Sequence, residues 1–165
     1  MSEQPFGQVP VYKESALCLF ESGAIVLHIG AKDERLLPRD EPGRARAIAW
    51  MFAALNSIEP QSMPLAMLTI IGSGAKWSDE ARAALTPFLQ ERLAHLAAAL
   101  GGNEWLEDRF TIGDLMMVDA LRTISDPTLV AAHPNLAAYV ARGTARPAFR
   151  RAMHAQLADL VSDAA

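Results

Sequence analysis

The fold class follows first from residues 7–29, which read GQVPVYKESALCLFESGAIVLHI. This stretch holds two short apolar runs, residues 7–12 and 16–20, separated by a few polar residues. Two such runs around a polar turn are typical of a β-hairpin. Ser22 then precedes a compact apolar stretch, which favours a helix start, although so short a run also fits a strand. The stretch therefore predicts a hairpin followed by a helix.

The chain beyond this stretch is rich in alanine and helical in pattern. Residues 33–43 are charged and contain two prolines, so they are expected to form a linker. A first long helix is expected from near Gly43 through Leu55. Pro60 and Pro64 should kink or interrupt it, because proline lacks a backbone donor and clashes with the preceding turn.

Two helix starts are signalled by capping residues. Ser78 is expected to cap a long helix that carries an apolar stripe and ends near Leu100, before two glycines. Thr111 and Asp114 are spaced as a capping box, in which each residue bonds the backbone of the other. This spacing assigns the pair a structural role, not a catalytic one.

The composition excludes several classes of function. Hydrophobic residues make up 51% of the 165 residues and charged residues 21%, which is typical of a globular protein. A net charge of −4 gives no reason to expect nucleic acid as a partner, and no apolar run is long enough to cross a membrane. Four scattered histidines and one cysteine predict no metal site. Cys18 is expected to be buried and inert, and a lone cysteine suits the cytoplasm.

Several segments, in this order and spacing, resemble the cytosolic glutathione transferases. The resemblance covers nearly the whole chain and implies a mainly α fold. A partial thioredoxin-like α/β piece, a hairpin plus a helix, would occupy residues 1–32 and bind glutathione. After the linker, an all-helical domain of the family's C-terminal type would occupy residues 44–165. The segments are residues 6–11 (FGQVPV), 20–25 (FESGAI), 111–114 (TIGD) and 146–149 (RPAF).

The resemblance also implies a glutathione site. The Val9–Pro10 peptide would be cis and would present the Val9 backbone to the cysteinyl part of glutathione; the alternative is a trans proline on an edge strand. Ser22 would hold the γ-glutamyl carboxylate at a helix N-terminus, and Glu21 would pair with the α-ammonium group. The alternative for this pair is plain helix capping, with Ser22 at the N-cap. Gln8 would reach the glycyl end.

The resemblance departs from the family at its start. Family members carry a strand, a helix and a second strand ahead of the Val-Pro segment, and the residue that activates the sulfur lies in that region. We therefore expect no catalytic residue within this chain, and whether it is an enzyme stays open. The first and third long helices would line the site of a hydrophobic electrophile, with Trp50, Met51, Leu55, Met116 or Met117 as candidates.

Two functions remain open. The first is a glutathione transferase that conjugates the thiol to a hydrophobic electrophile or reduces a peroxide, once the expected upstream segment is supplied. The second is a non-catalytic binding or assembly module. A homodimer is expected as the partner. In the absence of the family's first strand, residues 7–12 would form an unpaired edge unless another chain or segment covers it.

Overall fold

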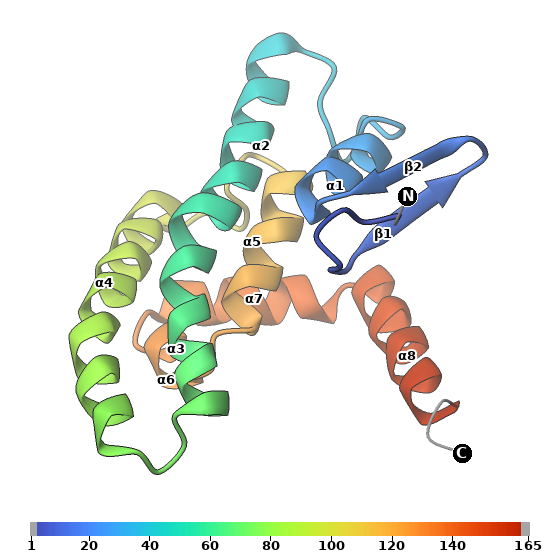
Figure 1. The fold of residues 1–165 in the computed structure, drawn as a ribbon. Helices are drawn as coiled ribbons and strands as arrows, with labels where there is room; N and C mark the ends of the chain where they lie inside the picture. Colours follow the sequence, from blue (N-terminus) through green and yellow to red (C-terminus); the bar gives the residue numbers. More distant parts are fainter. Residues whose placement is uncertain (1–2, 163–165) are drawn as a thin grey trace.

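The computed structural model describes residues 3–162 and shows a small α/β piece beside a bundle of helices (Figure 1). The two strands pair antiparallel, with Val11 opposite Phe20 and Glu14 opposite Leu17. This confirms the hairpin and the helix expected from residues 7–29, with a first strand that begins only after Pro10. The elements of the piece are β1 (Val11–Glu14), β2 (Leu17–Phe20) and α1 (Ser22–Gly30).

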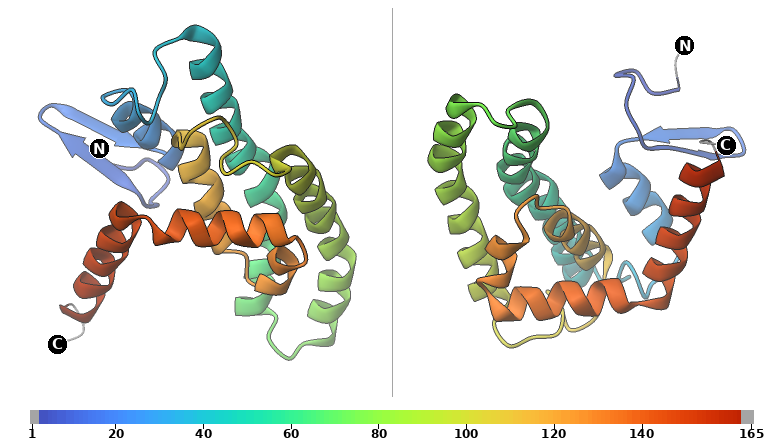
Figure 2. Two further views of the ribbon diagram at one scale, coloured as in Figure 1. Left: turned by 180° about the vertical axis from the view of Figure 1, so that it is seen from behind. Right: turned by 90° about the horizontal axis from the view of Figure 1, so that it is seen from below.

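The rest of the described chain is helical, which confirms the expected fold class. In Figure 1, α2 and α3 follow one another in a long column, α4 runs back beside α3, and α5 lies between this column and the α/β piece. Helix α8 extends away from the bundle, as Figure 2 shows from behind. These elements are α2 (Glu41–Ala53), the π-helical turn η1 (Ala54–Ile58), α3 (Glu59–Ile71), α4 (Lys76–Leu100), α5 (Ile112–Arg122), α6 (Pro127–Ala131), α7 (Pro134–Ala145) and α8 (Pro147–Ser162).

The core of the bundle lies where α2 and α5 cross. Ala47 and Met51 of α2 and Met117 of α5 are almost fully buried there. Gly113 allows the close approach, because a Cβ atom at this position would lie 3.0 Å from the carbonyl oxygen of Ala47. None of the helices within residues 3–162 is long and apolar enough to cross a membrane.

The long helical column begins earlier than expected and is interrupted by a π-helical turn. The Asp40 carboxylate caps α2 by accepting the Gly43 N–H at 2.8 Å, so the helix already begins at Glu41. The turn η1 then ends two residues before Pro60, which has no N–H for a regular helical hydrogen bond. Pro64 lies inside α3 without ending it.

The expected cap of α4 is wrong. The helix begins at Lys76 after Ala75, and Ser78 lies within its first turn. Ser78 is buried, and its hydroxyl donates to the carbonyl oxygen of Leu68 at 3.4 Å. The side chain therefore joins α4 to the end of α3 instead of capping its own helix.

The segment between α1 and α2 packs against the bundle. Leu37 is only 2% exposed and belongs to the hydrophobic core. The Ile112 N–H donates to the Leu36 carbonyl oxygen at 2.9 Å, and the Arg109 guanidinium donates to the Glu34 carbonyl oxygen at 3.0 Å. The segment expected as a linker thus holds α1 against the N-terminus of α5, and the domain boundaries remain a prediction.

Candidate functional site

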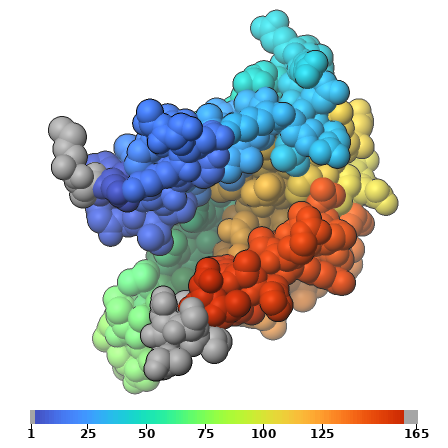
Figure 3. All heavy atoms as spheres, turned by 90° about the vertical axis from the view of Figure 1, so that its right-hand side faces the viewer, coloured from blue at the N-terminus to red at the C-terminus, as the bar shows by residue number. Residues whose placement is uncertain are grey.

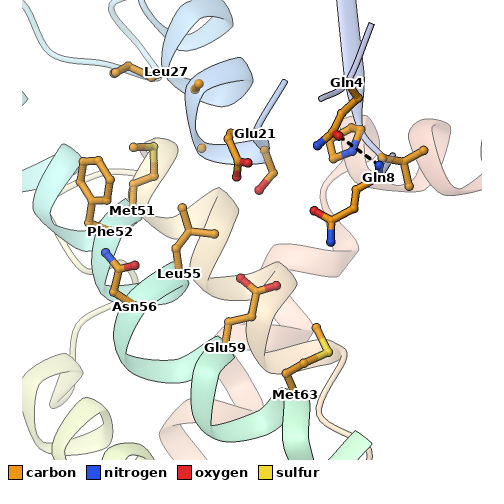
Figure 4. A pocket seen from close by; sticks show the side chains of 15 residues that line it. Gln4, Gln8, Glu21, Leu27, Met51, Phe52, Leu55, Asn56, Glu59 and Met63 are labelled. Atoms are coloured by element: carbon orange, nitrogen blue, oxygen red, sulfur yellow. Dashed lines mark hydrogen bonds between the residues drawn. The ribbon is translucent and has the colours of Figure 1, made fainter. Parts of the chain in front are cut away.

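A pocket of about 830 Å³ opens between the α/β piece and the helical column. Figure 3 shows the hollow between the N-terminal residues and the helices. Its volume lies in the range of small-molecule sites. The close view in Figure 4 shows polar side chains from the N-terminal piece facing side chains of α2, η1 and α3.

All five residues expected to bind glutathione line this one pocket: Gln8, Val9, Pro10, Glu21 and Ser22. The peptide bond between Val9 and Pro10 is cis. The Val9 side chain is 90% exposed, so it makes little contact with the rest of the protein. The structure thus brings together residues from two separate segments, and their role in binding remains a prediction.

The N-terminus of α1 faces the pocket through Glu21 and Ser22. Glu21 occupies the N-cap position with φ 70° and ψ 120°, and no side chain caps the helix. Ser22 is the first helical residue. The plain capping alternative is therefore wrong for both side chains. A non-glycine residue at this φ carries backbone strain of about 1–3 kcal/mol, a feature common at binding sites, and the first-turn amides of a helix can hold an anion.

A loop before β1 is ordered by Gln4, which the sequence analysis did not single out. Its side chain is 7% exposed, and its Oε1 accepts the N–H groups of Phe6 at 2.6 Å and Gln8 at 3.1 Å. These two bonds fold the loop so that Gln8 and Val9 reach the pocket wall. The local sequence does not mark Gln4 as a structural residue, because the turn that its hydrogen bonds close has no recognisable sequence motif.

The hairpin is fixed to α1 by a cluster of polar side chains. The Glu14 carboxylate contacts the ammonium group of Lys32 and lies 3.1 Å from Nε2 of His28. Hydrogen bonds from Lys32 and His28 lower the pKa of the Glu14 carboxyl to about 2. The Tyr12 ring lies against His28, with 5.8 Å between ring centroids. This cluster holds β1 against α1, and so fixes the segment just before β1, which carries Gln8 to Pro10, relative to the start of α1, which carries Ser22.

The opposite wall of the pocket is mainly apolar. Met51 and Leu55, both expected to face an electrophile, line it together with Phe52 and Met63. An adjoining pocket of about 270 Å³ is lined by Met116, among others, and shares residues with the first. The other two candidates do not reach this site: Trp50 and Met117 line a separate pocket of about 260 Å³.

Thr111 and Asp114 form a capping box at the start of α5. The Asp114 carboxylate accepts the Thr111 N–H at 2.9 Å, and the Thr111 hydroxyl accepts the Gly113 N–H at 3.2 Å. Asp114 also accepts bonds from the Leu106 N–H and the Tyr139 hydroxyl, each at 2.9 Å. Burial raises the pKa of the Asp114 carboxyl, and these hydrogen bonds oppose the rise. Neither residue lines the pocket, in keeping with a structural role.

The expectation of a buried Cys18 is wrong. The thiol is free and exposed, and Cys18 pairs across the hairpin with Lys13. Both Cys18 and Lys13 are exposed, so their side of the hairpin is not covered by the helices. Cys18 does not line the pocket. Within residues 3–162, no three His, Cys, Asp or Glu side chains gather in a way that could hold a metal ion.

Comparisons with curated proteins find plant relatives. A protein named glutathione S-transferase from Hyoscyamus muticus is 30% identical to this chain, and the match covers 90% of this chain and 75% of that protein. Glutathione S-transferase F11 of Arabidopsis thaliana is also 30% identical, with 91% and 75% covered. The chain thus spans about three quarters of the length of these relatives. No family model matches the chain.

Solved structures show the same fold. A glutathione transferase from Burkholderia graminis superposes with a TM-score of 0.81 at 28% identity, over 92% of this chain and 68% of that chain. That structure holds two glutathione molecules per subunit. Glutathione transferase F2 from Populus trichocarpa superposes with a TM-score of 0.80 over 94% of this chain and 78% of that chain, and at 23% identity this likeness concerns the fold alone.

Proposed function

The chain belongs to the glutathione S-transferase family, and from this premise we propose that its main pocket binds glutathione. The proposal rests on one observation: the same pocket is lined by Gln8, Val9, Pro10, Glu21 and Ser22. The glutathione held by the Burkholderia graminis relative supports it further.

Each part of the tripeptide has a matching group in this pocket. The γ-glutamyl carboxylate is bound by the Ser22 hydroxyl and the first-turn amides of α1, where the helix dipole favours an anion. The Glu21 carboxylate pairs with the α-ammonium group, and the Val9 backbone pairs with the cysteinyl part. The Gln8 amide meets the glycyl end. The sulfur then points toward the apolar wall formed by Met51 and its neighbours.

We further propose that a hydrophobic electrophile occupies this apolar wall during conjugation, with peroxide reduction as the second reaction. Either reaction requires a donor that stabilises the thiolate at neutral pH. Among the described residues that line the main pocket there is no tyrosine and no cysteine. Ser22 is the one residue of this lining with a hydroxyl group, and we assign that group to the γ-glutamyl end of glutathione. We therefore expect that binding of glutathione and its catalytic conjugation can be measured separately in this chain.

The second function, a binding or assembly module, is favoured by one observation. Strand β1 pairs only with β2 in the described chain, so its other edge is open. An open edge is a template for pairing with another chain. We propose a homodimer on this ground, in a cytoplasmic setting. Light scattering behind a sizing column should show a dimer at micromolar concentration, and a stable monomer would contradict the proposal.

The glutathione site is tested residue by residue by NMR. Titration of the ¹⁵N-labelled chain with reduced glutathione should shift the amide signals of Val9, Ser22 and Gly23 and leave Gly143, in the bundle core, unchanged. The dipeptide cysteinylglycine lacks the γ-glutamyl group and should not shift Ser22. Unchanged Val9 and Ser22 signals at millimolar glutathione would contradict the proposed site.

A further inference from the structure

Glu59 is a carboxylate on the apolar side of the site. It lies at the start of α3 and lines both the main pocket and the adjoining one. Figure 4 shows its side chain reaching into the pocket between Leu55 and Met63, below Glu21. Glu59 is half-buried, and within residues 3–162 its carboxylate has neither a hydrogen bond nor an ion pair.

The fold gives Glu59 no strong structural reason to be there. A glutamate in the first turn of a helix often stabilises free amides. Here η1 runs directly into α3, and the Glu59 N–H already donates to the Ala54 carbonyl oxygen. The residue after it is Pro60, which has no N–H. A neutral side chain would serve the helix about as well.

The charges around the site leave Glu59 without a counter-ion. No lysine, arginine or histidine is among the described residues that line either pocket. Asp119, in the adjoining pocket, is paired with the Arg122 guanidinium at 2.6 Å. Glu21 is assigned to the ammonium group of glutathione. Glu59 is thus the one carboxylate of this site that remains to meet the second ligand.

We infer that Glu59 selects the charge of the second ligand, so that the site accepts hydrophobic electrophiles that are neutral or cationic and disfavours anionic ones. The inference rests on the proposed function, because it concerns the group attached to the sulfur of bound glutathione. A cationic group in this wall gains a partner, whereas an anionic group loses its hydration beside a like charge. Because this carboxylate is half-exposed, we expect each unit change in the charge of the ligand's S-substituent to change its affinity for the site by about fivefold.

Three S-substituted glutathiones of similar length test this inference by calorimetry: S-aminohexyl, S-hexyl and S-carboxypentyl glutathione. The wild-type chain should bind them in that order of decreasing affinity. Glu59→Gln should bring the three affinities together, with the smallest change for S-hexylglutathione, whose alkyl group carries no charge. Glu91→Gln, an exposed glutamate on α4 outside both pockets, is the matched control and should keep the full order.

The outcomes separate the two proposals. Equal wild-type affinities for the three conjugates would overturn the charge selection, as would a Glu59→Gln variant that weakens all three alike. Failure of S-hexylglutathione to bind would overturn the glutathione site. In that case hexyltrimethylammonium and hexanesulfonate probe the apolar wall directly. Glu59-dependent preference for the cation would sustain the charge selection, and its absence would overturn it.

Discussion

Replacement of Asp114 by alanine should be among the most destabilising single changes in this chain. The Asp114 side chain is fully buried and accepts four hydrogen bonds. Two come from Thr111, its N–H at 2.9 Å and its hydroxyl at 3.2 Å. The others come from the Leu106 N–H and the Tyr139 hydroxyl, both at 2.9 Å. Alanine would leave these donors without a partner at the junction of α5, α7 and the loop before α5.

The expected loss follows from counting these donors. A buried donor without a partner costs about 1–3 kcal/mol. Four donors at about 1 kcal/mol each give roughly 4 kcal/mol, and release of a buried charge offsets a part. The net loss should be about 3–4 kcal/mol, a large share of the roughly 5–15 kcal/mol of a typical domain. Tyr139→Phe removes one donor and should cost about 1 kcal/mol.

Urea unfolding followed by circular dichroism at 222 nm measures these losses. Thr111→Ser keeps the hydroxyl and the capping box but deletes one buried methyl group, so this matched control should lose only about 1 kcal/mol. If Asp114→Ala is too unstable to purify, Asp114→Asn can replace it, because asparagine has nearly the same shape as aspartate. This variant should lose about 2 kcal/mol, because the NH₂ group of asparagine would face hydrogen-bond donors where a carboxylate oxygen now accepts. An Asp114→Ala loss no larger than that of Tyr139→Phe would refute the reasoning.

Further changes test packing and electrostatics. Gly113→Ala should cost about 1–3 kcal/mol in urea unfolding, since the added methyl group would lie 2.6 Å from an α2 side chain, whereas Gly102→Ala has open space and should be nearly neutral. Leu93→Ala removes a fully buried side chain and should cost about 2–5 kcal/mol. NMR titration should give the Glu14 carboxyl a pKa of about 2, rising toward 4.5 in Lys32→Met. Because this pKa is lowered, the stability Glu14 contributes is present above pH 4.5 and lost as the pH falls toward 2.

Local signals in the sequence were sufficient for much of the fold. The hairpin, the helix that begins at Ser22, and the capping box of Thr111 and Asp114 each depend on a few neighbouring residues. These predictions were confirmed because the residues that pair in each feature are close together in the sequence. The five candidate site residues came from the family resemblance, and the structure places them together at one pocket.

Other features depend on contacts that no local pattern reveals. Cys18 lies in an apolar run, but which face of a strand is covered depends on neighbours that the run does not specify. Serine is a common helix-capping residue, yet the Ser78 hydroxyl donates to the carbonyl oxygen of Leu68 near the end of α3. Gln4 and Glu59 reach the pocket through a folded loop and a π-helical turn. Pro60 was the available signal for that turn, because the missing donor favours a local rearrangement of the helix.

The central claim, a glutathione site built on the N-terminus of α1, is tested most directly by calorimetric titration of the purified chain with reduced glutathione. The account predicts a dissociation constant between micromolar and millimolar. Glu21→Gln should weaken binding about fivefold by removing the partner of the α-ammonium group, and Glu91→Gln should leave it unchanged. No heat of binding at millimolar glutathione, or equal affinity in all three proteins, would contradict the account.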